Sequence, residues 1–94
     1  MTLLLKDPQA VLDYGIDWGA EYLAADDVLT ESSWSVDPDE PSGVVVVDSS
    51  FDEKLSSVQA GGGLAGRLYQ LANRVVTQFG RVDERSIVLR VEQR

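Results

Sequence analysis

The segment at residues 61–91, GGGLAGRLYQLANRVVTQFGRVDERSIVLRV, decides the fold class. It contains two extended runs joined by a short polar turn with a glycine. The odd-numbered positions at residues 69–79 are mainly apolar or aromatic, with Asn73 and Thr77 among them, and apolar residues alternate again at residues 87–91. Alternation with a period of two residues is typical of a half-buried strand, and helical periodicity fits neither run. The segment therefore predicts a β-hairpin whose apolar face, the odd-numbered one, requires further strands to cover it.

Strand signals recur in the preceding part of the chain. Residues 11–18 alternate between apolar and polar side chains, which favours a strand over a competing helix at residues 8–25, where two internal glycines would each cost about 1 kcal/mol. Residues 28–36 form another candidate strand, with Trp34 on its inner face as the expected central core residue and Leu29 on the outer face. The four valines at 44–47 predict a strand covered on both faces or an edge strand that meets a partner. Residues 51–60 alternate poorly and predict only a short strand.

Turn signals separate these segments. Residues 1–10 are interpreted as a lead-in, because Asp7-Pro8 disfavours helical geometry and marks a boundary. A loop or one helical turn is expected at residues 20–24. Residues 37–43, DPDEPSG, predict an exposed acidic loop, and the glycines at 61–63 predict a flexible break.

Six or seven short strands at this spacing predict an all-β fold, a small antiparallel β-sandwich of immunoglobulin-like or fibronectin-III-like kind. Its 94 residues are expected to form a single domain, residues 1–94. Trp18, Trp34 and Tyr69 are the expected core aromatic residues. Tyr69 follows a glycine-rich loop at the start of a strand, so it is either the tyrosine of a sandwich corner or an ordinary core residue.

Composition excludes several function classes. The chain has no cysteine and no histidine, which removes disulfides, thiolate metal sites and the usual general base. Residues 1–53 hold 13 acids and one lysine, whereas residues 54–94 hold three acids and seven cations. The net charge of −8 argues against a nucleic-acid partner, because phosphate contacts need clustered cations. The charge either keeps the protein soluble or gives it an acidic face and a basic face for two different neighbours. Residues 1–7 do not read as a signal peptide, and no apolar run reaches the ~20 residues of a membrane-spanning helix.

The sequence offers only weak candidates for a catalytic or cation-binding site. Asp13 and Asp17 are the remote candidates for a hydrolytic carboxylate pair, but outward solvated side chains of an amphipathic strand explain them better. The acids of the 37–43 loop suggest a cation site, although an ordinary acidic turn is the simpler interpretation. We therefore expect no catalytic, cofactor or metal site. The charged hairpin tip formed by Arg81, Asp83, Glu84 and Arg85 is either a solvated turn or a partner-contact site.

Three groups of fragments carry a family resemblance: KDP at 6–8 with LDY at 12–14 and DW at 17–18; TESSWSV at 30–36; and NRVVT at 73–77 followed by GRVDERS at 80–86. In this order they resemble a family of small tailed-phage and prophage structural proteins, the fibre–tail adaptor proteins. The resemblance covers most of the chain, except that residues 38–57 are longer and more acidic than its pattern.

The resemblance implies a non-enzymatic virion component, made in the host bacterial cytoplasm and present in several copies in a symmetric assembly. Its implied partners are other phage structural proteins of the tail, portal or capsid, with no nucleic acid and no membrane. An adaptor between the tail or portal region and the fibres is the leading hypothesis. A capsid decoration protein is the alternative, and a small hydrolase is a remote third.

Overall fold

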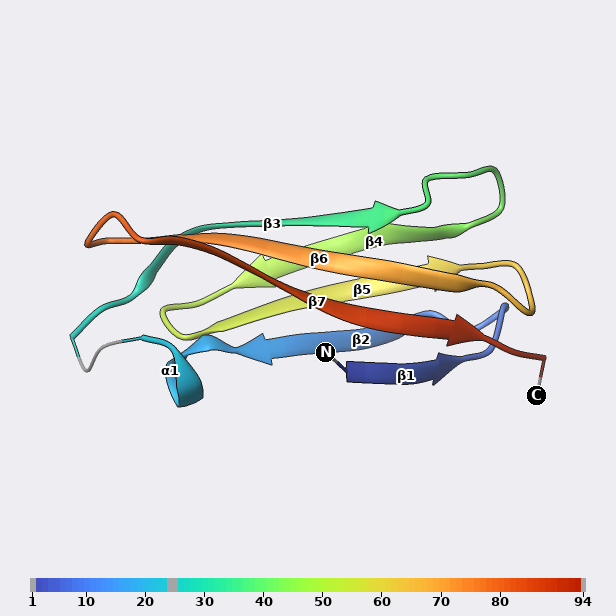
Figure 1. Ribbon diagram of the computed structural model, residues 1–94, viewed down its shortest axis with the longest axis horizontal. Coiled ribbons are helices and arrows are strands. Elements are labelled where there is room, and N and C mark those ends of the chain that lie inside the picture. The colour runs from blue at the N-terminus through green and yellow to red at the C-terminus, as the bar shows by residue number, and fades with distance from the viewer. Residues whose placement is uncertain (1, 24–25, 94) are drawn as a thin grey trace.

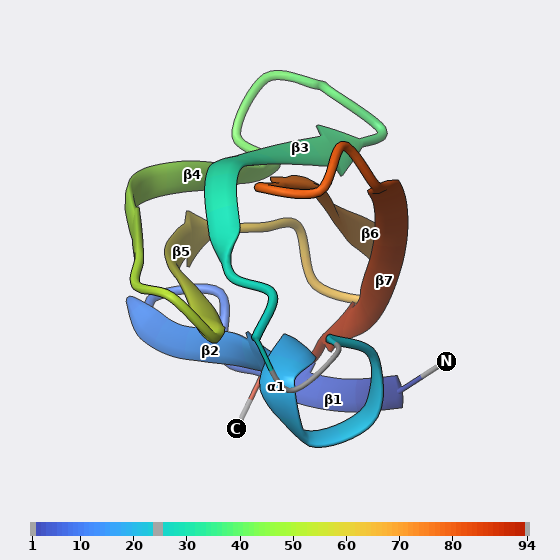
Figure 2. The same cartoon turned by 90° about the vertical axis from the view of Figure 1, so that its left-hand side faces the viewer.

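Seven strands and one helical turn make up the described chain, residues 2–23 and 26–93 of the computed structural model (Figure 1). They are β1 (Thr2–Lys6), β2 (Leu12–Asp17), α1 (Trp18–Glu21), β3 (Leu29–Asp37), β4 (Val44–Phe51), β5 (Leu55–Gly62), β6 (Leu68–Thr77) and β7 (Val82–Val91). Figure 2, which looks along the strands, shows that they form two layers around a shared interior.

The strand order is that of an immunoglobulin-like sandwich. One sheet has the order β1-β7-β6-β3 and the other has the order β2-β5-β4. In immunoglobulin-like domains the second, fifth and fourth strands likewise share one sheet, and the third, sixth and seventh share the other. The prediction of a small all-β sandwich is therefore confirmed.

The first strand corrects two parts of that prediction. Residues 2–6 are not a lead-in but the edge strand β1, and β1 runs parallel to β7, with Thr2 opposite Ile87 and Lys6 opposite Val91. The other strand pairs are antiparallel. A parallel partner from the far end of the chain needs no hairpin turn, so the local sequence contains no signal for this pairing. After Lys6 the chain crosses to the other sheet.

The main core lies under the closing hairpin that the sequence singled out. Alternate residues of β6 and β7 point inward and are buried, and they pack against Val58 and Ala60 of β5. The inward face was predicted correctly from Tyr69 to Thr77. Phe79 was placed on the same face, but it lies in the turn after β6 and is 57% exposed. Glycine at position 80 adopts φ 83° there and reverses the chain before the alternation can continue.

A second, smaller core closes the end of the sandwich near α1. Trp18 is fully buried and packs with Leu29 and Val75. Leu29 was expected on the outer face of its strand. A register shift between Leu29 and Glu31 in the β3–β6 ladder inserts an extra residue, so Leu29 points inward although it is out of phase with the rest of β3.

Trp34 is not the central core residue that the sequence predicted. It is half-buried, because β3 is an edge strand of its sheet, and it packs on the flank of the main core. Its indole N–H donates to Ser56 Oγ at 3.0 Å.

The central strand of the smaller sheet was also underestimated. β5 has eight residues and pairs with β2 on one side and β4 on the other. Gly61 and Gly62, expected in a flexible break, are the last two residues of this strand. Glycine fits at position 61 because the side chains of Val11 and Val47 approach it from either side of β5. A Cβ atom at Gly61 would lie within 3.3 Å of both side chains.

Candidate functional site

A buried polar network joins the two sheets at the position where the resemblance motifs meet. The Trp18 indole N–H donates to Asn73 Oδ1 at 2.9 Å, and Asn73 Nδ2 donates to Ser32 Oγ and to the Ser33 carbonyl. Ser32 Oγ lies 2.7 Å from Ser56 Oγ of the opposite sheet. Since Trp18, Asn73 and Ser56 have no exposed surface, these bonds satisfy groups that would otherwise be costly to bury.

The second part of the resemblance, residues 80–86, does not form one charged tip. The turn ends at Arg81, and Asp83, Glu84 and Arg85 belong to β7. Arg85 lies opposite the inward residue Asn73, and its guanidinium sits 4.9 Å from the centroid of the Trp18 ring. Successive side chains of a strand point to opposite faces, so Glu84 faces outward opposite Arg74, which is exposed. The candidate contact residues are therefore divided between the turn, the interior and the outer face.

Tyr69 combines the two roles that the sequence left open. It is buried, and its hydroxyl oxygen accepts a hydrogen bond from the Leu64 backbone N–H at 3.1 Å, the contact that defines a tyrosine corner. The hydroxyl donates to Glu40 Oε1 at 2.7 Å, and Arg67 forms an ion pair with the other oxygen of Glu40 at 3.2 Å. Burial, followed by the hydrogen bond to Glu40, raises the pKa of Tyr69.

The acidic loop is consequently not freely exposed throughout. Asp39, Pro41 and Ser42 are exposed, but Glu40 is half-buried against the tyrosine corner. The described residues contain no group of three or more Asp, Glu, His or Cys side chains arranged to hold a metal ion.

Lys6 anchors the point where the chain changes sheets. Its side chain is buried, and Nζ donates to the carbonyl of Asp7 at 2.8 Å and to that of Gly62 at 2.6 Å. The second bond links β1 of one sheet to β5 of the other. Burial lowers the pKa of Lys6, although the adjacent Asp7 opposes this shift.

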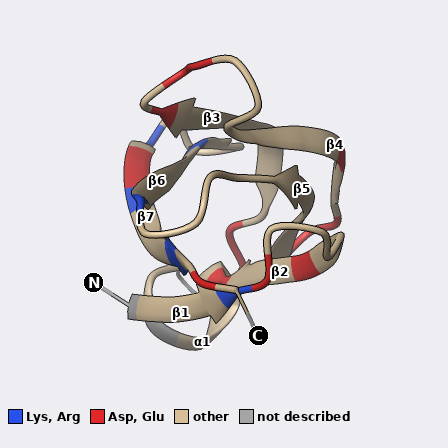
Figure 3. Ribbon diagram, turned by 90° about the vertical axis from the view of Figure 1, so that its right-hand side faces the viewer, with Lys and Arg blue, Asp and Glu red and all other residues tan. Residues whose placement is uncertain are grey.

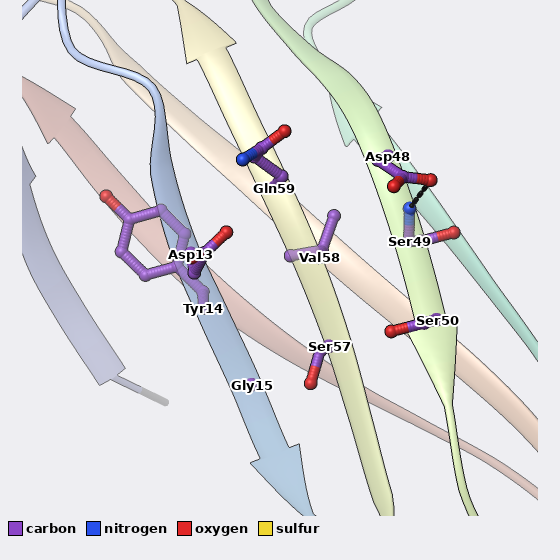
Figure 4. Close-up of a pocket in the computed structure, with 9 residues that line it drawn as sticks. All are labelled: Asp13, Tyr14, Gly15, Asp48, Ser49, Ser50, Ser57, Val58 and Gln59. Carbon is purple, nitrogen blue, oxygen red and sulfur yellow. Dashed lines mark hydrogen bonds between the residues drawn. The ribbon is translucent and has the colours of Figure 1, made fainter.

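A surface groove lies on the outer face of the smaller sheet and crosses β2, β5 and β4 (Figure 4). It has a volume of about 510 Å³. Asp13, Gln59 and Asp48 form one row across the three strands, because Gln59 is the register partner of both aspartates. The next row consists of Gly15, Ser57 and Ser50, whose small side chains leave the surface hollow.

The two aspartates proposed as a remote hydrolytic pair have different environments. Asp13 lines the groove, whereas Asp17 Oδ1 accepts from the Ala20 N–H at 3.1 Å and caps the short helix α1. Both carboxylates are exposed, and they are four residues apart on an extended strand, a separation of roughly 13 Å. The structure does not bring them together.

Asp48 and Gln59 are the groove residues that sequence reasoning missed. Asp48 was interpreted as the end of the valine strand, and Gln59 lay in a segment that predicted only a short, weak strand. The alternation of Ser56, Val58 and Ala60 with Ser57 and Gln59 was the available signal, and it would have placed Gln59 on the outer face.

Among the described residues, the structure contains no helix with the length and apolar character needed to cross a membrane. No curated protein matches the chain. A family model described as podophage GP4 fibre-tail adaptor protein gp77 matches residues 6–90, which include every fragment of the resemblance. Because this match covers most of its length, the chain belongs to the family of podophage fibre-tail adaptor proteins.

Proposed function

We propose that the protein is a non-enzymatic adaptor that joins the tail or portal region of a tailed phage to its fibres or to other tail proteins. The family match over residues 6–90 carries this proposal. The structure supports it through its sandwich architecture, in which the motif residues Trp18, Asn73 and Arg85 stabilise the interior and leave the outer faces of both sheets available for partners. Such an adaptor acts in several copies within a symmetric assembly.

The distribution of charge also suits a protein that docks to others. No lysine or arginine lies in β2, β4 or β5, whereas the strands of the other sheet carry equal numbers of acids and cations. Figure 3 shows acidic segments of the ribbon on β2, on β4 and in the β3–β4 loop, whereas β7 carries both acidic and basic segments. The strands of the smaller sheet are therefore acidic, and those of the larger sheet have no net charge. Binding through such a surface weakens as salt is added.

Locating the protein in purified particles tests this function. We expect electron cryo-microscopy to place it between the tail or portal and the fibres, and particles assembled without the gene product to lack fibres. Density confined to the capsid lattice would overturn the adaptor function and support capsid decoration instead. If the affinity for the partner is the same at low and high salt, the acidic surface serves solubility and not binding.

A further inference from the structure

We propose that the groove across β2, β5 and β4 is a docking site for an extended partner segment that carries an arginine or lysine next to an apolar residue. The chemistry of this ligand is inferred from the groove alone. The identification of the partner as another tail component rests on the proposed function above.

The first support is charge without an internal counterion. Asp13 and Asp48 face each other across Gln59, and neither has an ion-pair partner among the described residues. Most of the cations of the chain are engaged elsewhere: Lys6 at the crossover, Lys54 with the Asp27 carbonyl, Arg67 with Glu40, Arg85 on Trp18 and Arg90 with Glu92. Arg74 and Arg81 of a second copy are exposed, but two chains that each carry a net charge of −8 repel one another, so a basic segment of a different protein is the better source of the missing charge.

The second support is the shape of the surface between the aspartates. Gly15 has no side chain and Ser57 has a short one, so the floor of the groove lies below the flanking row of longer side chains (Figure 4). The serines at 49, 50 and 57 add hydroxyl groups that can accept from a guanidinium or ammonium group. Tyr14 packs against the main core and its hydroxyl is buried, so the polar groups on the surface of the groove come from the aspartates, Gln59 and the serines.

The third support is an exposed apolar patch beside the aspartate row. Val11 and Val47 are 53% and 54% exposed, and their side chains converge over Gly61. Val45, the register partner of Gly61, is 51% exposed and extends the patch. Since β4 is an edge strand of this sheet, an extended segment can approach over the patch and the groove together.

A peptide titration tests the ligand chemistry independently of any role in the particle. The probe is acetyl-Gly-Arg-Val-Gly-amide, and the control peptide has glutamine in place of arginine. We expect amide chemical-shift changes centred on Asp13, Gly15, Asp48, Ser57 and Gln59, with binding weakened about fivefold by the double variant D13N/D48N. The matched control D37N/D39N removes the same charge from exposed positions outside the groove and leaves binding unchanged. Equal weakening by both variants, or equal binding of the glutamine peptide, would overturn the site.

Assembly of particles then tests the biological use of the groove. Particles carrying D13N/D48N should lose the protein or the fibres, whereas particles carrying D37N/D39N should be normal. If D13N/D48N particles are normal, the groove is not the docking site. The adaptor function would survive that result, because it is decided separately by the location of the protein and by particles assembled without it.

Discussion

Asn73 is the centre of the buried polar network between the sheets. One amide side chain accepts from the Trp18 indole and donates to Ser32 and to the Ser33 carbonyl. The cysteine pair that crosses many immunoglobulin-like domains is absent from this chain, and the amide network links the same two sheets without a covalent bond.

Replacing Asn73 by alanine should destabilise the protein by about 2–4 kcal/mol, because the buried Trp18 indole N–H loses its acceptor and the partly buried Ser32 hydroxyl and Ser33 carbonyl each lose a donor. Equilibrium urea unfolding followed by tryptophan fluorescence measures this loss. The control is R74A, the neighbouring outward residue, which should change the stability by less than about 0.5 kcal/mol. Similar unfolding midpoints for the two variants would contradict the central role of the network.

The two tryptophans should differ in their contributions to stability. Trp18→Ala removes a fully buried ring and should cost about 3–5 kcal/mol. Trp34→Ala removes a half-buried ring at an edge strand and should cost roughly 1–3 kcal/mol. Thermal unfolding of both variants under one buffer condition provides the comparison. A larger loss for Trp34 would restore the core position that the sequence suggested for it.

At the scale of elements, the loop between β5 and β6 joins the two sheets in a narrow space. Gly63 adopts φ 113°, and a Cβ atom there would lie 2.7 Å from a methyl group of Val91. Gly66, in the same loop, has φ 84° and nothing within 4 Å of its Cβ position.

These two glycines form a matched pair for mutation. Gly66→Ala should cost about 1–2 kcal/mol from backbone strain alone. Gly63→Ala adds overpacking against Val91 to the same kind of strain and should cost about 3 kcal/mol or more. Chemical denaturation measures both. Equal costs would show that Val91 moves aside and that the loop tolerates a side chain.

The sequence predicted the elements with strong alternation and missed those specified by distant contacts. The inward face of β6 and the apolar residues of β7 were read correctly, because their period of two residues is local. The pairing of β1, the bulge beside Leu29 and the half-burial of Trp34 depend on neighbours far along the chain, so no short window contains them. Of the groove, only Asp13 was singled out, since Asp48 and Gln59 reach it through cross-strand register.

For the whole molecule, alkaline pH should weaken the tyrosine corner. The pKa of Tyr69 is raised above its ordinary value of 10.0, so folding favours the protonated hydroxyl. The stability that this preference contributes is complete below pH 10 and is lost as the pH rises through the folded-state pKa. The effect of Lys6 on the pH dependence of stability has the opposite sign. Because its pKa is lowered in the folded protein, stability rises as the pH approaches the ordinary lysine value of 10.5.

Comparison with Y69F separates the two contributions, since Lys6 is present in both proteins. The stability advantage of the natural chain over Y69F should be about 1–3 kcal/mol near neutral pH and should shrink above pH 10. The matched control is Y14F, which removes a buried hydroxyl without a partner among the described residues and should be neutral or slightly stabilising at neutral pH. An advantage over Y69F that is constant to pH 11 would contradict the assignment.

The parallel pairing of β1 with β7 has a mechanical consequence. Tension applied at Thr2 and at Val91 pulls the two strands along their length in opposite directions, so the five register pairs from Thr2–Ile87 to Lys6–Val91 share the load and must rupture together. Tension applied at Lys6 and Val91, which lie at the same end of the ladder, peels the pairs apart one after another. Single-molecule pulling should therefore record a higher rupture force in the first geometry than in the second. An adaptor that carries load between Thr2 and Val91 would therefore resist it far better than a load applied at Lys6 and Val91.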